Sequence, residues 1–333
     1  MFVRWAGDDR LRMPHHSTAM IPSKAPLAVV PLLLFLSTMT RDKRAAPIPA
    51  TYHVYLLAGQ SNMDGYGRVA ELPEGMRGAQ EGVVIFHGSP AADGDVIHGG
   101  QGRWAPLQGG HGRGFRSDGE HNTYSDAFGI ELAFAQHLRA LDPEANIALI
   151  KYSRGGTSIH AGAAGNFGCW EPDWEGGTDA GQGVNQYDHC LATLRTAFAA
   201  RDVDGDGSED RLVPAGILWM QGESDAYHTP EIAAAYEANL KRLMDLLRAA
   251  LRTDDLPVVI GRISDSGRDD DGVVWTHGEV VRAGQAAFVK KDGHAALVTS
   301  TDDYAYSDPW HYDTAGFLDL GKQFAEAAVG LHR

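Results

Sequence analysis

From residue 52 onward, the chain alternates short apolar segments with longer segments whose apolar residues recur at helical spacing. This alternation limits the fold more than any other feature. The apolar segments are rich in Val, Ile and Leu, show little polar alternation, and run over 54–58, 82–86, 147–152, 212–220, 257–263 and 295–301. The segments with helical spacing run over 126–141, 185–200, 230–252, 278–290 and 314–331. Buried strands that alternate with amphipathic helices predict an α/β fold, with a parallel sheet covered by helices on both faces.

This part of the chain shows no internal repeat and no second domain boundary, so we predict one domain over residues 51–333. Hydrophobic residues make up 43% of the 333 residues and charged residues 22%, a balance that can bury a core. The net charge of −15 argues against nucleic acid and anionic membrane surfaces as partners, because both would repel the chain. An acidic balance also serves solubility alone.

Residues 1–50 differ from the rest, and we predict that they form a signal peptide and a disordered leader. Residues 1–44 hold seven basic and three acidic residues. The apolar run 25–36 follows Lys24 and contains prolines. It is too short to span a bilayer but suits the apolar core of a secretory signal. We therefore expect a secreted or periplasmic protein without a stable membrane span, with a disordered cytoplasmic tail as the alternative.

Ser61 is the candidate nucleophile because it follows the charge-free apolar run Val54–Ala58 directly after Gly59-Gln60. A serine at the carboxyl end of a buried strand lies at the edge of an open α/β sheet where such folds bind ligands. The alternative is that Ser61 only caps the next helix. Asp64, Tyr66 and Arg68 come next and could reach a substrate or hold the loop in place.

Asp308 and His311 supply the partners that a nucleophilic serine needs. They lie three residues apart between the last predicted strand and the last predicted helix. One turn can bring the carboxylate to imidazole Nδ1 and leave Nε2 free to take the serine proton. Because turns at the ends of parallel strands meet at one edge of the sheet, we predict that Asp308 and His311 lie beside Ser61.

The negative oxygen of an acyl-transfer intermediate needs donors that are already in place. Two more strand-end turns could supply them, Gly155-Gly156 and Gln221-Gly222-Glu223. We predict an oxyanion hole made of the backbone N–H groups of Ser61 and Gly156 and the side-chain amide of Gln221. Further residues are predicted to support the site, with Glu223 as a buried carboxylate that orients Gln221 or the serine loop: Gln60, Asn62, Gly155 and Glu223.

Four motifs in this order resemble those of the SGNH-type hydrolases. They are G-Q-S-N-M at 59–63, R-G-G-T-S-I at 154–159, W-M-Q-G-E-S-D at 219–225 and D-P-W-H at 308–311. The likeness is greatest to the sialate O-acetylesterase-like and carbohydrate esterase family 6 (acetylxylan esterase) branch, in which Q-G-E stands where other SGNH enzymes carry asparagine. The G-x-S-x-G motif of α/β-hydrolases is absent, because Met63 takes the place of its second glycine.

The resemblance implies a flavodoxin-like three-layer α/β/α sandwich and the removal of acetyl groups from sugar hydroxyls. It assigns Ser61 as nucleophile, His311 as base and Asp308 as its orienting acid, with Gly156 and Gln221 as oxyanion donors. We expect an acetylated carbohydrate as substrate, such as acetylated xylan or sialic acid, and no cofactor for catalysis. The alternatives are a general short-acyl esterase and a carbohydrate-binding protein of the same fold without turnover.

Two further features concern structure rather than catalysis. Asp202, Asp204, Asp206 and Asp210 have the oxygen spacing of a calcium loop, but Val213 stands where a bidentate glutamate belongs. The loop could hold a structural calcium ion or be an acidic loop without metal. Cys169 and Cys190 could form a disulfide in an exported protein or remain unpaired. Trp170 and Trp174 could stack on a sugar or pack within their own loop.

Overall fold

The computed structural model describes residues 49–90, 99–176 and 184–332. The described residues belong to one compact unit. Of the predicted leader over 1–50, only residues 49 and 50 are among those described. In the described part of the chain, no helix is both long enough and apolar enough to cross a bilayer.

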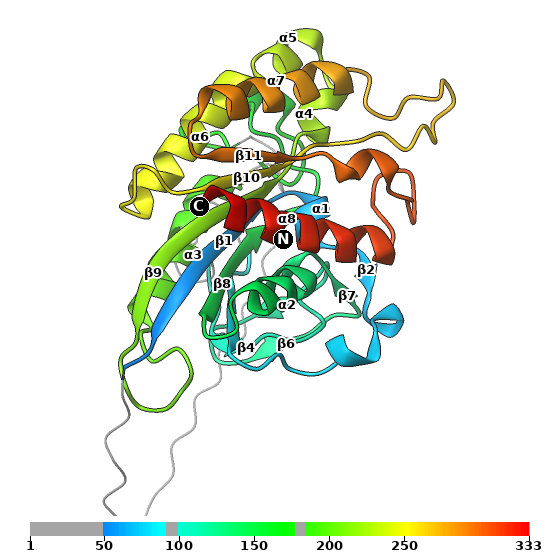
Figure 1. Cartoon of the computed structure of the whole chain (residues 1–333). Coiled ribbons are helices and arrows are strands. Elements are labelled where there is room, and N and C mark those ends of the chain that lie inside the picture. Colours follow the sequence, from blue (N-terminus) through cyan, green and yellow to red (C-terminus); the bar gives the residue numbers. More distant parts are fainter. Residues whose placement is uncertain (1–48, 91–98, 177–183, 333) are drawn as a thin grey trace, which may run out of the picture. The chain divides into compact units, whose positions relative to one another are not determined.

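A seven-stranded sheet forms the centre of the unit (Figure 1). Its strands lie side by side in the order β11 (Ala295–Val298), β10 (Val258–Gly261), β9 (Arg211–Met220), β1 (Thr51–Gly59), β8 (Asn146–Ser153), β3 (Val83–His87) and β4 (Trp104–Pro106). All neighbours pair in parallel except β4, which runs antiparallel to β3 at the edge. The predicted parallel sheet is therefore correct, and the sequence reasoning missed only the short antiparallel edge strand.

The sequence of the central strand β1 carries almost no polar residue because the strand is buried between two neighbours. It pairs with β8 on one side and β9 on the other, and Val54 to Ala58 are all buried. The register against β9 shifts between Val54 and Tyr55, opposite Pro214. Because proline has no N–H to give to a ladder, a proline within a sheet is accommodated at such an irregularity.

Helices flank the sheet. They are α1 (Ser61–Asp64), α2 (Glu131–Leu141), α3 (Gln186–Ala199), α4 (Glu223–Tyr227), α5 (Pro230–Ala234), α6 (Tyr236–Ala250), α7 (Gly278–Lys291) and α8 (Thr314–Leu331). Helices α2 and α8 pack against each other in front of the sheet in Figure 1, while α3 contacts β8 from behind and α6 packs on α7. The sheet is thus a layer between helices, as predicted.

The segment 230–252, predicted as one helix, is two. Helix α5 begins after the N-cap Thr229, whose side chain accepts a hydrogen bond from the N–H of Ile232, and Ala235 separates it from α6. The inward face of α6 includes Leu240, Leu243 and Leu247, as its spacing predicts. Tyr236 at the start of α6 is fully buried, and its hydroxyl donates a hydrogen bond to the backbone carbonyl of Gln221.

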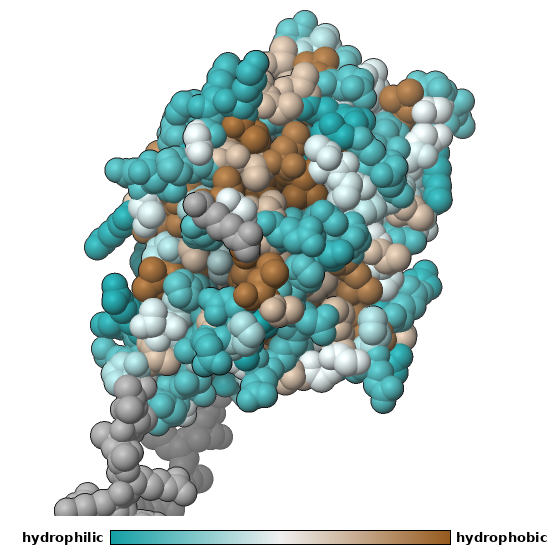
Figure 2. Space-filling model, viewed as in Figure 1, coloured by the Kyte–Doolittle hydropathy of each residue, from teal (hydrophilic) through white to brown (hydrophobic). Residues whose placement is uncertain are grey.

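Two-stranded ladders and 3-10 helices complete the described elements. The ladders join β2 (Gly67–Arg68) to β7 (Ala127–Phe128) and β5 (Arg116–Ser117) to β6 (Asn122–Thr123). The 3-10 helices are η1 (Val69–Glu71), η2 (Glu74–Met76), η3 (Ala161–Ala163) and η4 (Ser300–Asp303). The face in Figure 2 is mostly hydrophilic, with an apolar area in the upper half of the view, where Figure 1 places α7 and the edge strand β11.

Candidate active site

Ser61 is the first residue of α1, directly beyond the carboxyl end of β1. Gly59 makes the sharp exit from the strand possible. Its φ is +144°, and a Cβ there would lie 2.0 Å from the carbonyl oxygen of Met220 in β9. Only glycine fits this close approach of two strands. Ser61 itself is largely buried and lines a cavity of about 700 Å³.

His311 and Asp308 come from the loop between η4 and α8. The Asp308 carboxylate lies 2.7 Å from His311 Nδ1, and its other oxygen accepts hydrogen bonds from the backbone N–H groups of Trp310 and His311. With Nδ1 held by the carboxylate, the Nε2 edge of the imidazole is left for another partner. His311 lines the same cavity as Ser61, although 250 positions separate them in sequence.

Asn62 joins the two loops. Its amide nitrogen donates to Glu223 Oε1 at 2.8 Å and to the carbonyl of Trp310 at 3.2 Å, and its oxygen accepts from the Tyr312 N–H. Glu223 is buried, and burial raises the pKa of its carboxyl. The serine turn, the histidine loop and the turn after β9 therefore meet on one amide side chain.

Lys151 holds the other end of the serine turn. It is fully buried in β8, and its ammonium donates to Glu131 Oε2 and to the carbonyls of Asp64 and His111, each at 2.8 Å. A buried ammonium costs stability unless all of its protons are bonded. Here three acceptors meet three protons, so the ion pair fixes the end of α1 instead of leaving a charge unpaired.

The surroundings of His311 favour the neutral form of its imidazole. Burial lowers the pKa of its imidazole below the usual 6.5, the bond to Asp308 opposes this, and the nearby Arg113 adds to it. Burial raises the pKa of Asp308, but the hydrogen bonds from His311 and Trp310 outweigh burial, and its pKa ends below the usual value. At neutral pH the pair is a neutral imidazole beside a carboxylate, as a general base requires.

Tyr66 covers one face of the His311 ring. The two rings stack with centroids 3.5 Å apart and planes 7° apart, and the Arg113 guanidinium lies 5.3 Å from the centroid of the Tyr66 ring. From the sequence, Tyr66 is expected either to reach a substrate or to hold its loop in place. No spacing rule could have shown the stack, because Tyr66 and His311 are brought together only by the fold.

Gly155 and Gly156 follow β8 and also line the cavity. A Cβ at Gly155 would lie 3.2 Å from the Ser61 Cβ, so a side chain here would crowd the nucleophile. Among the described residues, the backbone N–H groups of Ser61 and Gly156 have no backbone acceptor. Both are therefore available to a ligand in the cavity.

Gln221 is placed differently from what its predicted oxyanion role requires. It is fully buried and does not line the cavity. Its amide nitrogen lies 2.7 Å from Asp225 Oδ2 and 3.0 Å from the Thr157 carbonyl, and its oxygen accepts from the Tyr236 hydroxyl. Its nitrogen is also 3.3 Å from Gln60 Oε1. In this geometry the amide group of Gln221 donates its protons to acceptors in the protein interior.

Exposed aromatic side chains surround the cavity, which is unusual for large apolar groups on a protein surface. Phe167 is 46% exposed, Tyr227 59% and Trp310 50%, and all three line it. From the sequence, Trp170 and Trp174 are the rings expected either to stack on a sugar or to pack within their own loop. Trp170 is fully buried, and its indole N–H donates a hydrogen bond to the Thr157 hydroxyl, so it packs within the loop.

The acidic loop before β9 brings three of its four predicted ligands together. Carboxylate oxygens of Asp202, Asp204 and Asp210 lie within 4.8 Å of one another, whereas Asp206 is not in this group and accepts from the Ser208 N–H. Cys169 and Cys190 are free and buried, and burial raises the pKa of each thiol to about 12.

A strand-end serine and a His–Asp pair on one cavity of an α/β sheet are typical of serine hydrolases. A family model described as "Carbohydrate esterase, sialic acid-specific acetylesterase" matches residues 51–330. The chain belongs to this family of carbohydrate esterases, which confirms the resemblance drawn from the four motifs. A comparison with curated protein sequences found no match.

Solved structures share the fold at low sequence identity. A protein from Arabidopsis thaliana is 20% identical, with a TM-score of 0.56 over 85% of this chain and 99% of its own. A carbohydrate acetylesterase from Xanthomonas citri is 18% identical, with a TM-score of 0.56 over 84% of this chain and 56% of its own. NanS is 16% identical, with a TM-score of 0.52 over 86% of this chain and 99% of its own.

Proposed function

We propose that this carbohydrate esterase removes O-acetyl groups from sugar hydroxyls through an acetyl-Ser61 intermediate. One observation carries the proposal: Ser61 and the Asp308-held His311 line the same cavity, which exposed aromatic side chains surround. Aromatic rings offer a flat apolar surface with a defined orientation. The apolar face of a pyranose can lie on such a ring while its ester points at the serine.

In the first half of the reaction, His311 Nε2 takes the proton of the Ser61 hydroxyl as the oxygen attacks the acetyl carbonyl. The carbonyl electrons move to the oxygen, which the N–H groups of Ser61 and Gly156 stabilise. The intermediate then collapses, the bond to the sugar oxygen breaks, and His311 returns the proton to the leaving hydroxyl. Asp308 keeps the imidazole oriented and stabilises its cationic form.

In the second half, water takes the place of the sugar. His311 removes a proton from the water, its oxygen attacks the acetyl carbon, and the bond to Ser61 breaks with return of the proton. Acetate leaves and the free enzyme is restored. Gln221 would join the oxyanion donors only by exchanging its bond to Asp225 or Thr157 for the intermediate.

The test is acetate release by the full chain from p-nitrophenyl acetate, acetylated xylan and an O-acetylated sialic acid, with Ser61→Ala beside the wild type. We expect turnover that the variant lacks, and higher kcat/KM on acetylated sugar than on p-nitrophenyl acetate. Preference for the aryl ester would favour a general short-acyl esterase. Sugar binding without turnover by the wild type would favour the binding protein.

Two further proposals come from the sequence. We propose that the protein is exported, which the basic residues and the apolar run 25–36 support. We also propose a structural calcium ion in the acidic loop, which the approach of Asp202, Asp204 and Asp210 supports. Neither the leader nor the calcium loop belongs to the machinery of the acyl transfer proposed above.

A further inference from the structure

The Tyr66 hydroxyl lies beside the nucleophile, at the Gly155-Gly156 turn. A Cβ built on Gly155 would have three nearest neighbours: Ser61 Cβ at 3.2 Å, Ser61 Cα at 3.6 Å and the Tyr66 hydroxyl oxygen at 3.8 Å. The hydroxyl and the nucleophile therefore meet the same side of Gly155. The next residue, Gly156, carries one of the two backbone N–H groups that are available to a ligand in the cavity.

The chain holds Tyr66 in place on both sides. Before it, Gly65 ends α1, and the Gly65 N–H donates to the Ser61 carbonyl at 2.8 Å. After it, Gly67 pairs in the ladder of β2 with β7. The ring itself is stacked on His311 with centroids 3.5 Å apart. The hydroxyl thus has a defined position before any substrate binds, which an oxyanion donor requires.

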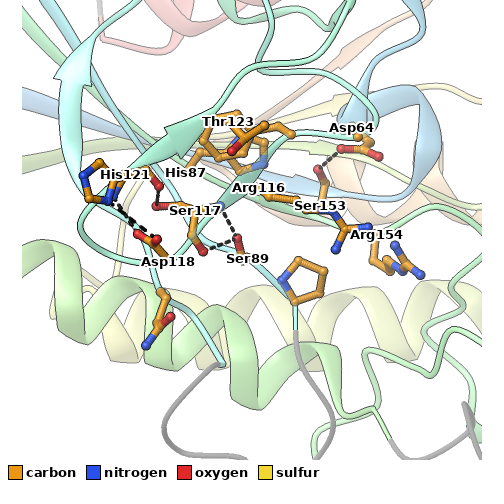
Figure 3. Close-up of a pocket in the computed structure, with 14 residues that line it drawn as sticks. Asp64, His87, Ser89, Arg116, Ser117, Asp118, His121, Thr123, Ser153 and Arg154 are labelled. Carbon is orange, nitrogen blue, oxygen red and sulfur yellow. Dashed lines mark hydrogen bonds and ion pairs between the residues drawn. The ribbon is translucent and has the colours of Figure 1, made fainter.

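The Tyr66 hydroxyl keeps its proton and forms no hydrogen bond with any residue that the structure describes. Burial raises the pKa of the phenol above its usual value of 10, the charge of Asp64 adds to this, and that of Arg113 opposes it. Asp64 does not accept the phenol proton. Its carboxylate instead accepts a hydrogen bond from the Ser153 hydroxyl at 3.5 Å, on the wall of a neighbouring cavity (Figure 3). The phenol O–H is therefore available to a ligand beside Ser61.

The oxyanion hole lacks the third donor that the sequence predicts. Gln221 gives its amide protons to buried acceptors, so two backbone N–H groups are left. Arg113 and Arg154 also line the cavity, but their guanidinium groups lie over aromatic rings. Among the described residues, and apart from the nucleophile itself, Tyr66 supplies the atom nearest to a Cβ at Gly155.

We propose that the Tyr66 hydroxyl is the third donor of the oxyanion hole, beside the N–H groups of Ser61 and Gly156. The inference rests on the proposed function and assigns a further catalytic residue to it. As the serine oxygen attacks and the carbonyl electrons move to the acetyl oxygen, the phenol donates a hydrogen bond to that oxygen and keeps its proton throughout. The ring of the same residue stays stacked on His311.

The experiment measures kcat and KM of the full chain on acetylated xylan and p-nitrophenyl acetate, for the wild type and for Tyr66→Phe. Phenylalanine keeps the ring on His311 and removes only the hydroxyl. We expect kcat to fall by ~10²-fold, as when one oxyanion donor is removed, while KM stays within about twofold. A fall in kcat of less than about tenfold, or a rise in KM alone, would overturn the proposal.

The pH profile separates the hydroxyl from the ring. In Tyr66→Phe the acidic limb of kcat/KM should stay where it is in the wild type, since the stack on His311 remains. Tyr66→Leu removes the ring as well, so His311 becomes less buried, its pKa rises toward 6.5 and the limb moves to higher pH. A limb that shifts equally in both variants would mean that Tyr66 only positions the base, and the donor role would be wrong.

Methaneboronic acid tests whether the hydroxyl acts on the transition state. Its boron bonds to the Ser61 oxygen, and the tetrahedral adduct carries an oxygen in the place of the oxyanion. Its inhibition constant should rise in Tyr66→Phe by about the factor by which kcat falls, because both depend on the same hydrogen bond. An inhibition constant equal to that of the wild type would also overturn the proposal.

Tyr124→Phe is the matched control, because Tyr124 is 38% exposed and does not line the cavity of Ser61. It loses a tyrosine hydroxyl too, and it should keep the kcat and KM of the wild type. Thermal melts of all variants check that each is folded. Absence of turnover by the wild type on every acetylated substrate would be a failure of the proposed function, whereas full turnover by Tyr66→Phe would count against this inference alone.

Discussion

The turns after β1 and after β9 look alike in sequence, yet the structure uses them in opposite ways. Each places amide and hydroxyl or carboxyl groups at the carboxyl end of a buried strand. The β1 turn presents Ser61 to the cavity. The β9 turn directs Gln221 and Asp225 into the interior, where both are fully buried.

The difference lies in what surrounds each polar group. Asp225 accepts hydrogen bonds from Gln221 and from the backbone of Ile159 and His160, so it ties β9 to the loop after β8. Ser61 lines the cavity, and its hydroxyl forms no hydrogen bond with any residue that the structure describes. A polar strand-end motif therefore identifies the active edge of the sheet but does not tell a reacting group from one that holds the reacting group in place.

Ser61→Ala should give the largest effect of those we expect. Loss of the nucleophile should lower kcat by ~10³-fold or more, since the residues of a triad act as a unit. Thermal unfolding should stay close to that of the wild type, because a small hydroxyl is replaced at a cavity wall. Turnover by the variant within tenfold of the wild type would show that another group is the nucleophile.

Gln221→Ala should act mainly on stability. Its loss leaves the Tyr236 hydroxyl, the Thr157 carbonyl and Asp225 short of a partner in the interior, which should lower the free energy of unfolding by about 2–3 kcal/mol. Urea denaturation measures this. A variant of normal stability that has lost ~10²-fold or more in kcat would instead assign Gln221 to the oxyanion hole.

Trp310→Ala should weaken carbohydrate binding without removing the chemistry. Its ring is half exposed at the cavity, so we expect a loss of about 1 kcal/mol, or roughly a fivefold rise in KM for an acetylated sugar. KM for p-nitrophenyl acetate serves as the comparison. An equal rise for both substrates would mean that the ring shapes the loop of His311 and does not stack on sugar.

The pH profile should show the environment of His311. The base must be neutral, and burial lowers its pKa below 6.5, so kcat/KM should be maintained at pH 6.5 and fall only at lower pH. Because the Arg113 charge also lowers this pKa, Arg113→Gln should move the acidic limb toward higher pH. A wild-type limb centred above 6.5 would contradict the buried, neutral imidazole.

Calcium should give the smallest effect. The acidic loop gathers three carboxylates but lacks the bidentate glutamate, so millimolar calcium should stabilise the fold by about 1 kcal/mol or less. Thermal melts with calcium, with magnesium and with a chelator measure this, with Asp204→Asn as the variant that should abolish the shift. Identical melts in all conditions would leave an acidic loop without metal.

The sequence alone determined the sheet and the active edge, because both depend on local patterns. Apolar strands and helical spacing are set by which residues must be buried, and they predicted β1, β3, β8, β9, β10 and β11. The spacing of Asp308 and His311 is equally local, and the structure has the contact that it predicts, 2.7 Å from carboxylate to Nδ1.

Only the tertiary structure decided how distant groups meet. The stack of Tyr66 on His311 and the link from Asn62 to Glu223 and Trp310 each join segments that no sequence spacing relates. The same holds for Gln221, whose motif predicts an oxyanion donor, while packing gives its amide protons to buried acceptors. Local sequence sets which groups are available, and long-range packing sets which partner each of them finds.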